Sequence, residues 1–257
     1  QPIGVKYDDA SRKVVCTLEQ DDIMDGLNWL HKWYQDGIIN PDANVVTDGG
    51  KGSIFGSAQG WPAAATTWAF NQGIEKYDLA QVFGPLYTTE TIQGSMNAIS
   101  ANSKYKTEAL KVLQLMNTDP KFRDMCAYGT EGNYMEYAED GTVQKLRDDW
   151  NWPSYTQGTF FILSTQADGD PDAWNQVKEQ NESATASTCL GFALDVTNIQ
   201  NEVANCNTVW DKYKNDLLTG ASDPATAVPA CIEELKAAGL DTVIEEAQKQ
   251  VDEFFAN

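Results

Sequence analysis

The sequence has few of the residues that usually hold metals. Its 257 residues include one histidine, His31, and five cysteines, at positions 16, 126, 189, 206 and 231. The cysteines are scattered, with no C-x-x-C and no histidine pair nearby, so a zinc site is not expected. Because five is odd, at least one thiol is unpaired unless it bonds another chain. We expect most cysteines to be free and buried, Cys206 above all, and we expect no metal or organic cofactor.

Basic residues and long apolar runs are also scarce. Eighteen Lys and Arg stand against 38 Asp and Glu, which gives a net charge of −20. Such a charge repels phosphate backbones and anionic lipid, so neither nucleic acid nor a membrane surface is an expected partner. No apolar run approaches the length that crosses a bilayer.

Motifs that mark enzymes are missing too. The sequence has no G-x-S-x-G, P-loop, H-E-x-x-H or dinucleotide fingerprint. His31 lies between Trp29 and Trp33 in an expected helix, which favours a helix-surface residue over a general base. No pair among the 38 acids stands out as the two carboxylates of a glycosidase. We therefore expect a non-enzymatic protein, although a carbohydrate-active enzyme domain and a cell-surface interaction module remain alternatives.

What the chain does have is the composition of a folded, helix-rich α/β protein. It is 42% hydrophobic, with eight Trp, ten Tyr and nine Phe, and it can form one large domain or two smaller ones. Residues 1–18 alternate like a hairpin, with strands at Val5–Tyr7 and Val14–Thr17. Apolar spacing and capping signals predict several helices, with Trp29 and Trp33 in the core. These helices are expected at Asp21–Gln35, Lys106–Met116, Asp119 to Gly129, after Asp170, from Asp223 to Gly239 and from Asp241 onward.

The stretch from Gly191 to Gly220 reads as a strand followed by a capped helix. Gly191 to Leu194 is a short apolar run, and Thr197 stands three residues before Gln200, the spacing of a capping box. Gly220 is placed to end the helix. One helical face carries a regular apolar stripe, made of Ile199, Val203, Cys206, Trp210, Tyr213 and Leu217.

Aromatic residues in loops are the candidates for a binding site. Trp61, Trp150 and Trp152 sit beside Gly or Pro outside the periodic helices. They can fill a core from a loop, or they can offer flat faces to a ligand such as a sugar ring. Glu131 and Tyr134 flank Gly132, where the missing side chain allows close approach of a ligand, and they are the expected partners of its hydroxyl groups.

The order of several segments resembles the extracellular solute-binding proteins of bacterial ABC importers, in the lipoprotein-type branch that binds carbohydrates. The motifs follow one another over nearly the whole chain. They are the helix and turn at Leu27–Ala43, the Gly-rich run to Gly60-Trp61, Asp119–Tyr134, Leu190–Phe192, Leu235–Asp241 and Gln248–Phe254.

This resemblance implies the C-terminal lobe of a two-lobe periplasmic-binding-protein-like fold. Residues 1–18 would be hinge-proximal strands, residues 19–190 the lobe itself, and residues 191–257 a closing strand with helices packed on the lobe. Such proteins begin with an N-terminal α/β lobe, which would be a missing partner of this chain. Without that lobe, the chain alone is expected to bind the solute feebly, because a one-sided site loses contacts and does not exclude solvent.

The resemblance also implies a function. The protein would bind an extracellular small-molecule solute, a sugar or oligosaccharide, and deliver it to the permease of an ABC transporter. It would lie at the cell surface, held by a lipid anchor in the part that precedes this chain. Trp61 and the Tyr128–Tyr134 loop match positions where the family contacts its solute, and Trp152 has weaker support.

Overall fold

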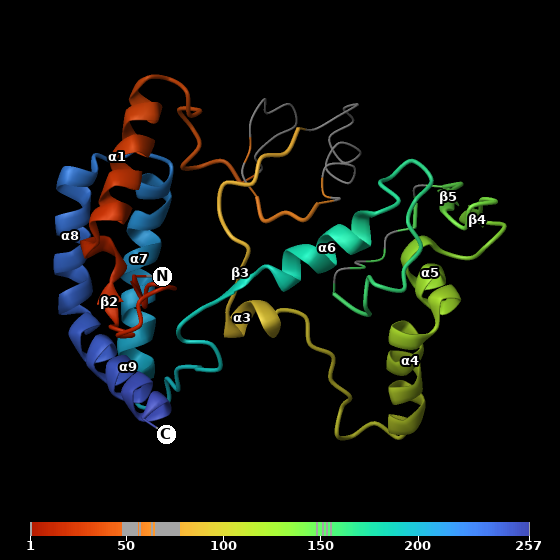
Figure 1. Cartoon of the computed structure of the whole chain (residues 1–257). Helices are drawn as coiled ribbons and strands as arrows, with labels where there is room; N and C mark the ends of the chain where they lie inside the picture. Colours follow the sequence, from red (N-terminus) through yellow and green to blue (C-terminus); the bar gives the residue numbers. More distant parts are fainter. Residues whose placement is uncertain are drawn as a thin grey trace. The chain divides into compact units, whose positions relative to one another are not determined.

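The computed structural model of the chain describes residues 2–47, 56, 58–62, 64, 78–147, 149–150, 152, 154 and 156–256 (Figure 1). The chain divides into two compact units. Unit 1 combines Gln1–Ser53 with Ala186–Asn257, and unit 2 is Ile54–Thr185. The expected division at residues 18/19 and 190/191 concerns the hinge of a two-lobe protein, and it stays a prediction.

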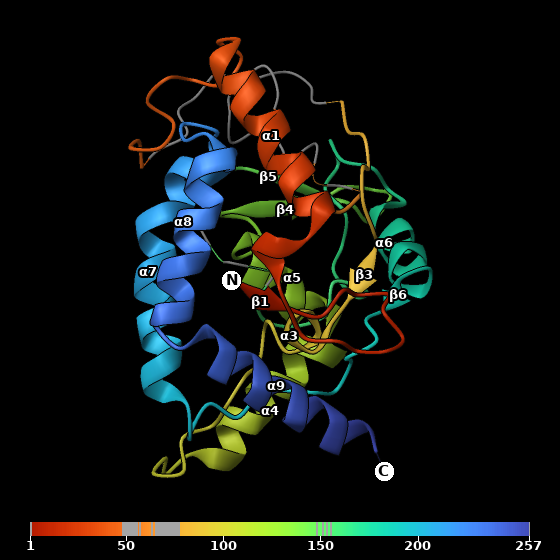
Figure 2. The ribbon, with the colours of Figure 1, turned by 90° about the vertical axis from the view of Figure 1, so that its left-hand side faces the viewer.

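Unit 1 is built on four helices and a small hairpin. Its elements are β1 (Ile3–Gly4), β2 (Val15–Cys16), the 3-10 helix η1 (Thr17–Glu19), α1 (Asp21–Gln35), α7 (Gln200–Leu218), α8 (Pro224–Ala237) and α9 (Leu240–Phe255). Strands β1 and β2 pair antiparallel, so the hairpin predicted for residues 1–18 is confirmed, with its first strand two residues earlier than expected. Helices α7 and α8 run side by side (Figure 2).

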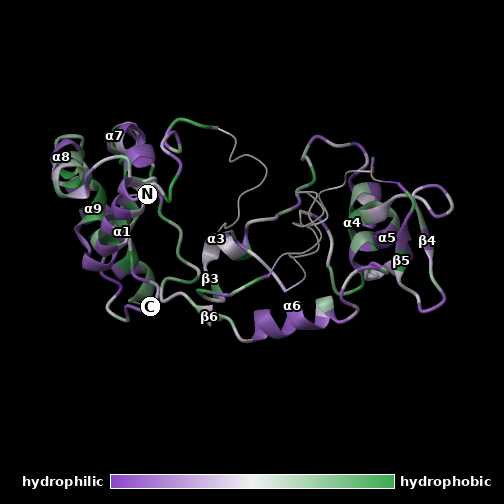
Figure 3. Ribbon diagram, turned by 90° about the horizontal axis from the view of Figure 1, so that it is seen from above, coloured by the Kyte–Doolittle hydropathy of each residue, from purple (hydrophilic) through white to green (hydrophobic). Residues whose placement is uncertain are grey.

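The main core of unit 1 lies where α1, α7, α8 and α9 meet. Figure 3 shows hydrophobic residues along α8 in this bundle. All five cysteines are free, and three of them are buried. These three act as small apolar residues, and burial raises the pKa of the Cys231 thiol to about 11. The buried residues are Cys16, Leu18, Leu27, Cys206, Leu217, Val228, Cys231, Leu235 and Leu240.

Gly220 fixes a close approach of α7 to α1. It has φ 79°, as the expected helix stop requires, and a Cβ at this position would overlap the Leu30 carbonyl group. His31 Nδ1 lies 2.7 Å from Gly220 O. Because a carbonyl oxygen only accepts, Nδ1 must carry the proton. His31 therefore fastens two helices together.

The prediction that Trp29 and Trp33 belong to the core is wrong. They are 57% and 42% exposed, with ring centroids 6.2 Å apart. The buried side of α1 is formed by Leu27, with Met24 and Leu30 packed beside it. The apolar residues of α1 thus cover a wider face than the one that α7 and α8 bury, and Trp29 and Trp33 lie outside the buried part.

The strand predicted at Gly191 to Leu194 is also absent from the described structure. Gly191 has φ 92°, far from the negative φ of an extended strand residue. Phe192 and Leu194 do pack inward, against a second core of Val14, Ala247 and Val251. The apolar residues of the run therefore pack inward, but on helix α9 and not beside another strand.

The capping box predicted at Thr197 is wrong as well. Helix α7 begins at Gln200, and its N-cap, Ile199, makes no side-chain capping bond. The Thr197 hydroxyl and backbone N–H instead donate to Asp195 Oδ1, at 2.6 and 2.9 Å. This local turn satisfies Thr197 before the helix starts.

Unit 2 consists of short helices and two-stranded pieces. Its elements are β3 (Leu86–Tyr87), α3 (Thr89–Ile92), α4 (Lys106–Thr118), α5 (Pro120–Tyr128), β4 (Met135–Tyr137), β5 (Val143–Lys145) and α6 (Ala173–Glu182), and β6 (Thr185–Ala186) pairs with β3 where the unit ends. Helices α4 and α5 agree with prediction, and Asp119 caps α5 by accepting Phe122 N–H at 3.0 Å.

Candidate functional site

All five predicted site residues belong to unit 2, and the structure brings two of them into direct contact. The rings of Tyr134 and Trp150 lie 5.2 Å apart, tilted by 56°. Tyr134 precedes β4 and Trp150 follows β5, so the antiparallel β4–β5 pair returns the chain to the same place. Leu146 N donates to Tyr134 O at 2.9 Å, which extends this pairing beyond the strands.

The turn that carries Glu131 and Tyr134 depends on two glycines. Gly129 has φ 90°, and a Cβ there would lie 2.5 Å from Tyr134 Cβ. Gly132 has φ 77°, but a Cβ there would meet nothing within 4 Å. Gly129 therefore makes room for the Tyr134 side chain, whereas Gly132 serves the turn and leaves open space beside exposed Glu131.

Trp150 is held by α5. Its indole Nε1–H donates to Cys126 O at 3.1 Å, and the side chain is half-buried. This bond orients the ring, so its position beside Tyr134 does not depend on a ligand. Together Tyr134 and Trp150 form what we call the aromatic pair.

Arg147 adds a cation to the aromatic pair, and analysis of the sequence missed it. Its guanidinium carbon lies 4.6 Å from the centre of the Tyr134 ring. Its Nε donates to Asp149 Oδ1 at 2.9 Å, and its Nη2 also contacts the Asp149 carboxylate. The hydrogen bond from Arg147 lowers the pKa of the Asp149 carboxyl group and raises that of the guanidinium. The available signal was an Arg next to an aromatic loop in a chain with few basic residues.

Beneath the aromatic pair, α5 is tied into the unit by a buried carboxylate. Asp124 accepts hydrogen bonds from Tyr137 Oη at 2.9 Å, Ser164 N at 2.9 Å and Ser164 Oγ at 2.8 Å. Tyr128 Oη donates to Ser164 O at 2.7 Å, and burial raises the pKa of this phenol. The helix that holds Trp150 through Cys126 is therefore fixed by its own buried polar bonds.

Arg123, next to Asp124, is fully buried. Its Nε donates to Thr159 O at 3.0 Å and its Nη2 to Ser154 O at 2.9 Å, while Nη1 has no hydrogen-bond partner in the described structure. Desolvation lowers the pKa of this guanidinium. These bonds fix the segment that follows Trp152 to α5.

The other two predicted residues are half-buried. Trp152 has a buried Nε1–H with no hydrogen-bond partner among the described residues. Trp61 lies in a stretch of which only parts are described. Whether Trp61, Glu131 and Trp152 join the aromatic pair in one site stays a prediction.

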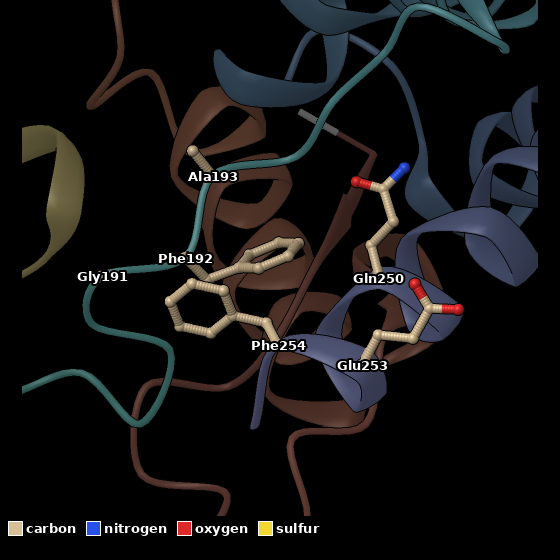
Figure 4. Close-up of a pocket in the computed structure, with 6 residues that line it drawn as sticks. All are labelled: Gly191, Phe192, Ala193, Gln250, Glu253 and Phe254. Atoms are coloured by element: carbon tan, nitrogen blue, oxygen red, sulfur yellow. The ribbon is translucent and has the colours of Figure 1, made fainter. Parts of the chain in front are cut away.

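A separate shallow pocket of about 480 Å³ lies in unit 1. Figure 4 shows the Phe192 and Phe254 rings on one side of it and the Gln250 and Glu253 side chains on the other. The Gln250 amide is already bonded to Asp195 and Glu246. None of the predicted site residues lines this pocket.

Two further features of the described part of the chain bear on the site. Among those residues, no three His, Cys, Asp or Glu side chains gather where they could share a metal ion. Within the same ranges, no helix has the length and apolar character needed to span a bilayer.

The fold is that of a solute-binding protein, and the resemblance to solute-binding proteins of ABC transporters found in the sequence is confirmed. One similar solved structure is that of the N-glycan transport solute binding protein NgtS of Streptococcus pneumoniae, with a TM-score of 0.86 and 24% identity over the whole chain. NgtS crystallised with Man1GlcNAc gives a TM-score of 0.81, and with Man5GlcNAc 0.79, both at 25% identity. The helix-rich α/β fold expected for a lobe of such a protein is thereby confirmed.

Sequence comparison points the same way. The chain is 26% identical over its full length to a "Carbohydrate ABC transporter substrate-binding protein" of Streptococcus pneumoniae serotype 4 (strain ATCC BAA-334 / TIGR4). Residues 188–256 match a family described as "Domain of unknown function (DUF3502)". The chain spans 54% of that relative and 59–60% of the NgtS chains.

Proposed function

We propose that this chain is part of an extracellular solute-binding protein that captures a sugar or oligosaccharide and delivers it to an ABC transporter permease. The observation that carries the proposal is the aromatic pair. Tyr134 and Trp150 are held 5.2 Å apart by protein contacts, beside the charged Arg147 and Asp149. An apolar wall with a few oriented polar groups suits a ring that has C–H faces and hydroxyl edges.

The relatives support this assignment. Two structures of NgtS hold mannose- and N-acetylglucosamine-containing glycans, and the sequence relative is named for carbohydrate transport. We assign Trp61, Glu131, Tyr134, Trp150 and Trp152 to the solute site. The three tryptophans would stack on the sugar, while Glu131 and Tyr134 would bond its hydroxyls.

The mechanism requires no covalent chemistry. A solute-binding protein closes two lobes on its ligand and presents the closed form to the permease. The partners are thus a small-molecule solute, the permease and an N-terminal lobe. The protein acts outside the cell at its surface, and a lipid anchor in the N-terminal part holds it at the membrane.

Calorimetry of the full-length protein against a panel of neutral oligosaccharides and short peptides tests the proposal. Saturable binding of an oligosaccharide supports it. Binding of peptides without binding of any sugar overturns the ligand class. Binding of neither overturns the solute-binding role. Product analysis after long incubation with the bound sugar addresses the enzyme alternative, because a carboxylate pair at work would release shorter saccharides.

A further inference from the structure

The arrangement of Arg147 is more specific than a surface ion pair requires. Its Nε and Nη2 both face the Asp149 carboxylate, and its Nη1 lies 3.4 Å from Asn133 Oδ1. The flat guanidinium also lies over the Tyr134 ring. Three groups, the Asp149 carboxylate, the Asn133 amide oxygen and the Tyr134 ring, thus orient the guanidinium.

Stability does not explain this arrangement. The side chains of Arg147 and Asp149 are 45% and 58% exposed, and exposed ion pairs contribute little to folding because water and salt screen them. The ordered polar groups remain open to solvent directly beside half-buried Tyr134 and Trp150. Ordered, accessible and adjacent to an aromatic wall, they are placed to meet a ligand.

The charge of these groups decides which ligand they suit. A lone guanidinium binds carboxylates through paired, charge-assisted hydrogen bonds. Here Asp149 already occupies that face of Arg147, so the pair carries no net charge. The Arg147 guanidinium keeps N–H donors that face solvent, and the Asp149 carboxylate keeps free lone pairs. A hydroxyl group can bond to both, because it donates and accepts. The net charge of −20 further disfavours an anionic ligand.

We propose that the Arg147–Asp149 pair selects neutral sugar rings at the aromatic pair and rejects acidic ones. This inference rests on the proposed function and adds a substrate class to it. Arg147 donates to ring hydroxyls, Asp149 accepts from them, and Asp149 also keeps the guanidinium from capturing a carboxylate. Asn133 and Tyr134 hold the fork in place.

The test compares two sugar probes on the full-length protein: the Man1GlcNAc disaccharide and a disaccharide of equal size with a glucuronic acid in place of the mannose. The variants are Asp149→Asn, which leaves the shape but frees the cation, and Arg147→Met, which keeps an apolar stem over Tyr134. The control is Asp211→Asn, which breaks the similarly exposed Lys214–Asp211 ion pair in unit 1.

We expect Asp149→Asn to weaken binding of the neutral disaccharide about tenfold, because a charged acceptor of a sugar hydroxyl is lost. The same variant should strengthen binding of the acidic disaccharide about fivefold or more, because Arg147 can then bond the carboxylate of the sugar. Arg147→Met should weaken neutral binding by about tenfold or more, and the control should change neither. An unchanged neutral-to-acidic ratio in Asp149→Asn overturns the inference alone. Wild-type protein that binds neither these probes nor any sugar of the wider panel overturns the proposed function, and the inference falls with it.

Discussion

The side-chain amide of Gln250 closes on the backbone of Asp195 from both sides. Its Nε2 donates to Asp195 O and its Oε1 accepts from Asp195 N, each at 2.9 Å. Gln248 does the same two residues earlier on α9, accepting from Val14 N at 2.8 Å and donating to Arg12 O at 3.3 Å. One helix thus satisfies two extended segments by side-chain amides that imitate the bonds of a neighbouring strand.

Replacing Gln250 by Ala should lower the free energy of unfolding of unit 1 by about 1 kcal/mol, because both backbone groups of Asp195 lose their protein partner. Urea denaturation followed by circular dichroism measures the loss. Glu245→Ala, on an exposed position of the same helix, is the control and should change little. Equal stabilities of the two variants would contradict the role given to Gln250.

Gly129→Ala should disturb the aromatic pair, whereas Gly132→Ala should cost only backbone strain. Both glycines have positive φ, so each substitution carries about 1–3 kcal/mol of backbone strain. Only the Cβ at position 129 meets Tyr134, at 2.5 Å. We expect about 1–3 kcal/mol of further destabilisation and a shifted tryptophan emission maximum for Gly129→Ala. Identical spectra and stabilities for the two variants would show that Gly129 does not position Tyr134.

Gly220→Ala should be far more costly than Gly37→Ala. Both follow a helix with φ near +75°, at 79° and 74°. The added Cβ at position 220 overlaps the Leu30 carbonyl, while at position 37 it meets nothing within 4 Å. We expect about 2 kcal/mol or more between them, since packed helix backbones cannot yield as a side chain does. Thermal melting compares the two, and matching melting temperatures would refute this account of the α1–α7 contact.

Glu234 should make a pH-dependent contribution to stability. Hydrogen bonds from Lys212 and Tyr213 lower the pKa of its carboxyl group below the ordinary 4.5. A lowered folded-state pKa adds stability above the unfolded pKa, and that stability is lost as pH falls through the folded value. The melting temperature of wild type should therefore exceed that of Glu234→Gln at pH 7, by a small margin because the groups are exposed. The margin should close below about pH 4.5; a margin that is constant across pH would disprove the linkage.

Trp61→Ala in the full-length protein should weaken sugar binding by more than about tenfold with little loss of thermal stability, as expected for a stacking face. The matched control is Trp29→Ala, which removes an exposed indole of unit 1. Calorimetry and thermal melting are both needed. A steep fall in melting temperature with unchanged affinity per folded molecule would show that Trp61 fills a core instead.

Local signals predicted the elements that local forces determine. The bounds of α1 followed from apolar spacing and the Asp36-Gly37 stop, and α5 followed from the Asp119 cap. The segment before α7 could not be predicted this way, because the partner of Asp195 is Gln250, 55 residues along the chain. For the candidate site, aromatic loops identified Tyr134 and Trp150. Arg147 was missed because its neighbourhood exists only once β4 and β5 have paired.

The hairpin that Gln248 holds has a consequence for how unit 1 is made. The core of unit 1 contains Leu18 and Leu27 from residues 1–53 together with Leu235 and Leu240 from residues 186–257. The segment that matches a sequence family, residues 188–256, thus lacks α1 and β2, both of which contribute residues to this core. During synthesis, residues 2–47 leave the ribosome before unit 2 and before α7–α9, so α1 waits for the helices that cover its apolar side. Unit 1 therefore completes its core only after α7–α9 have been made, and α1 is exposed to chaperones until then.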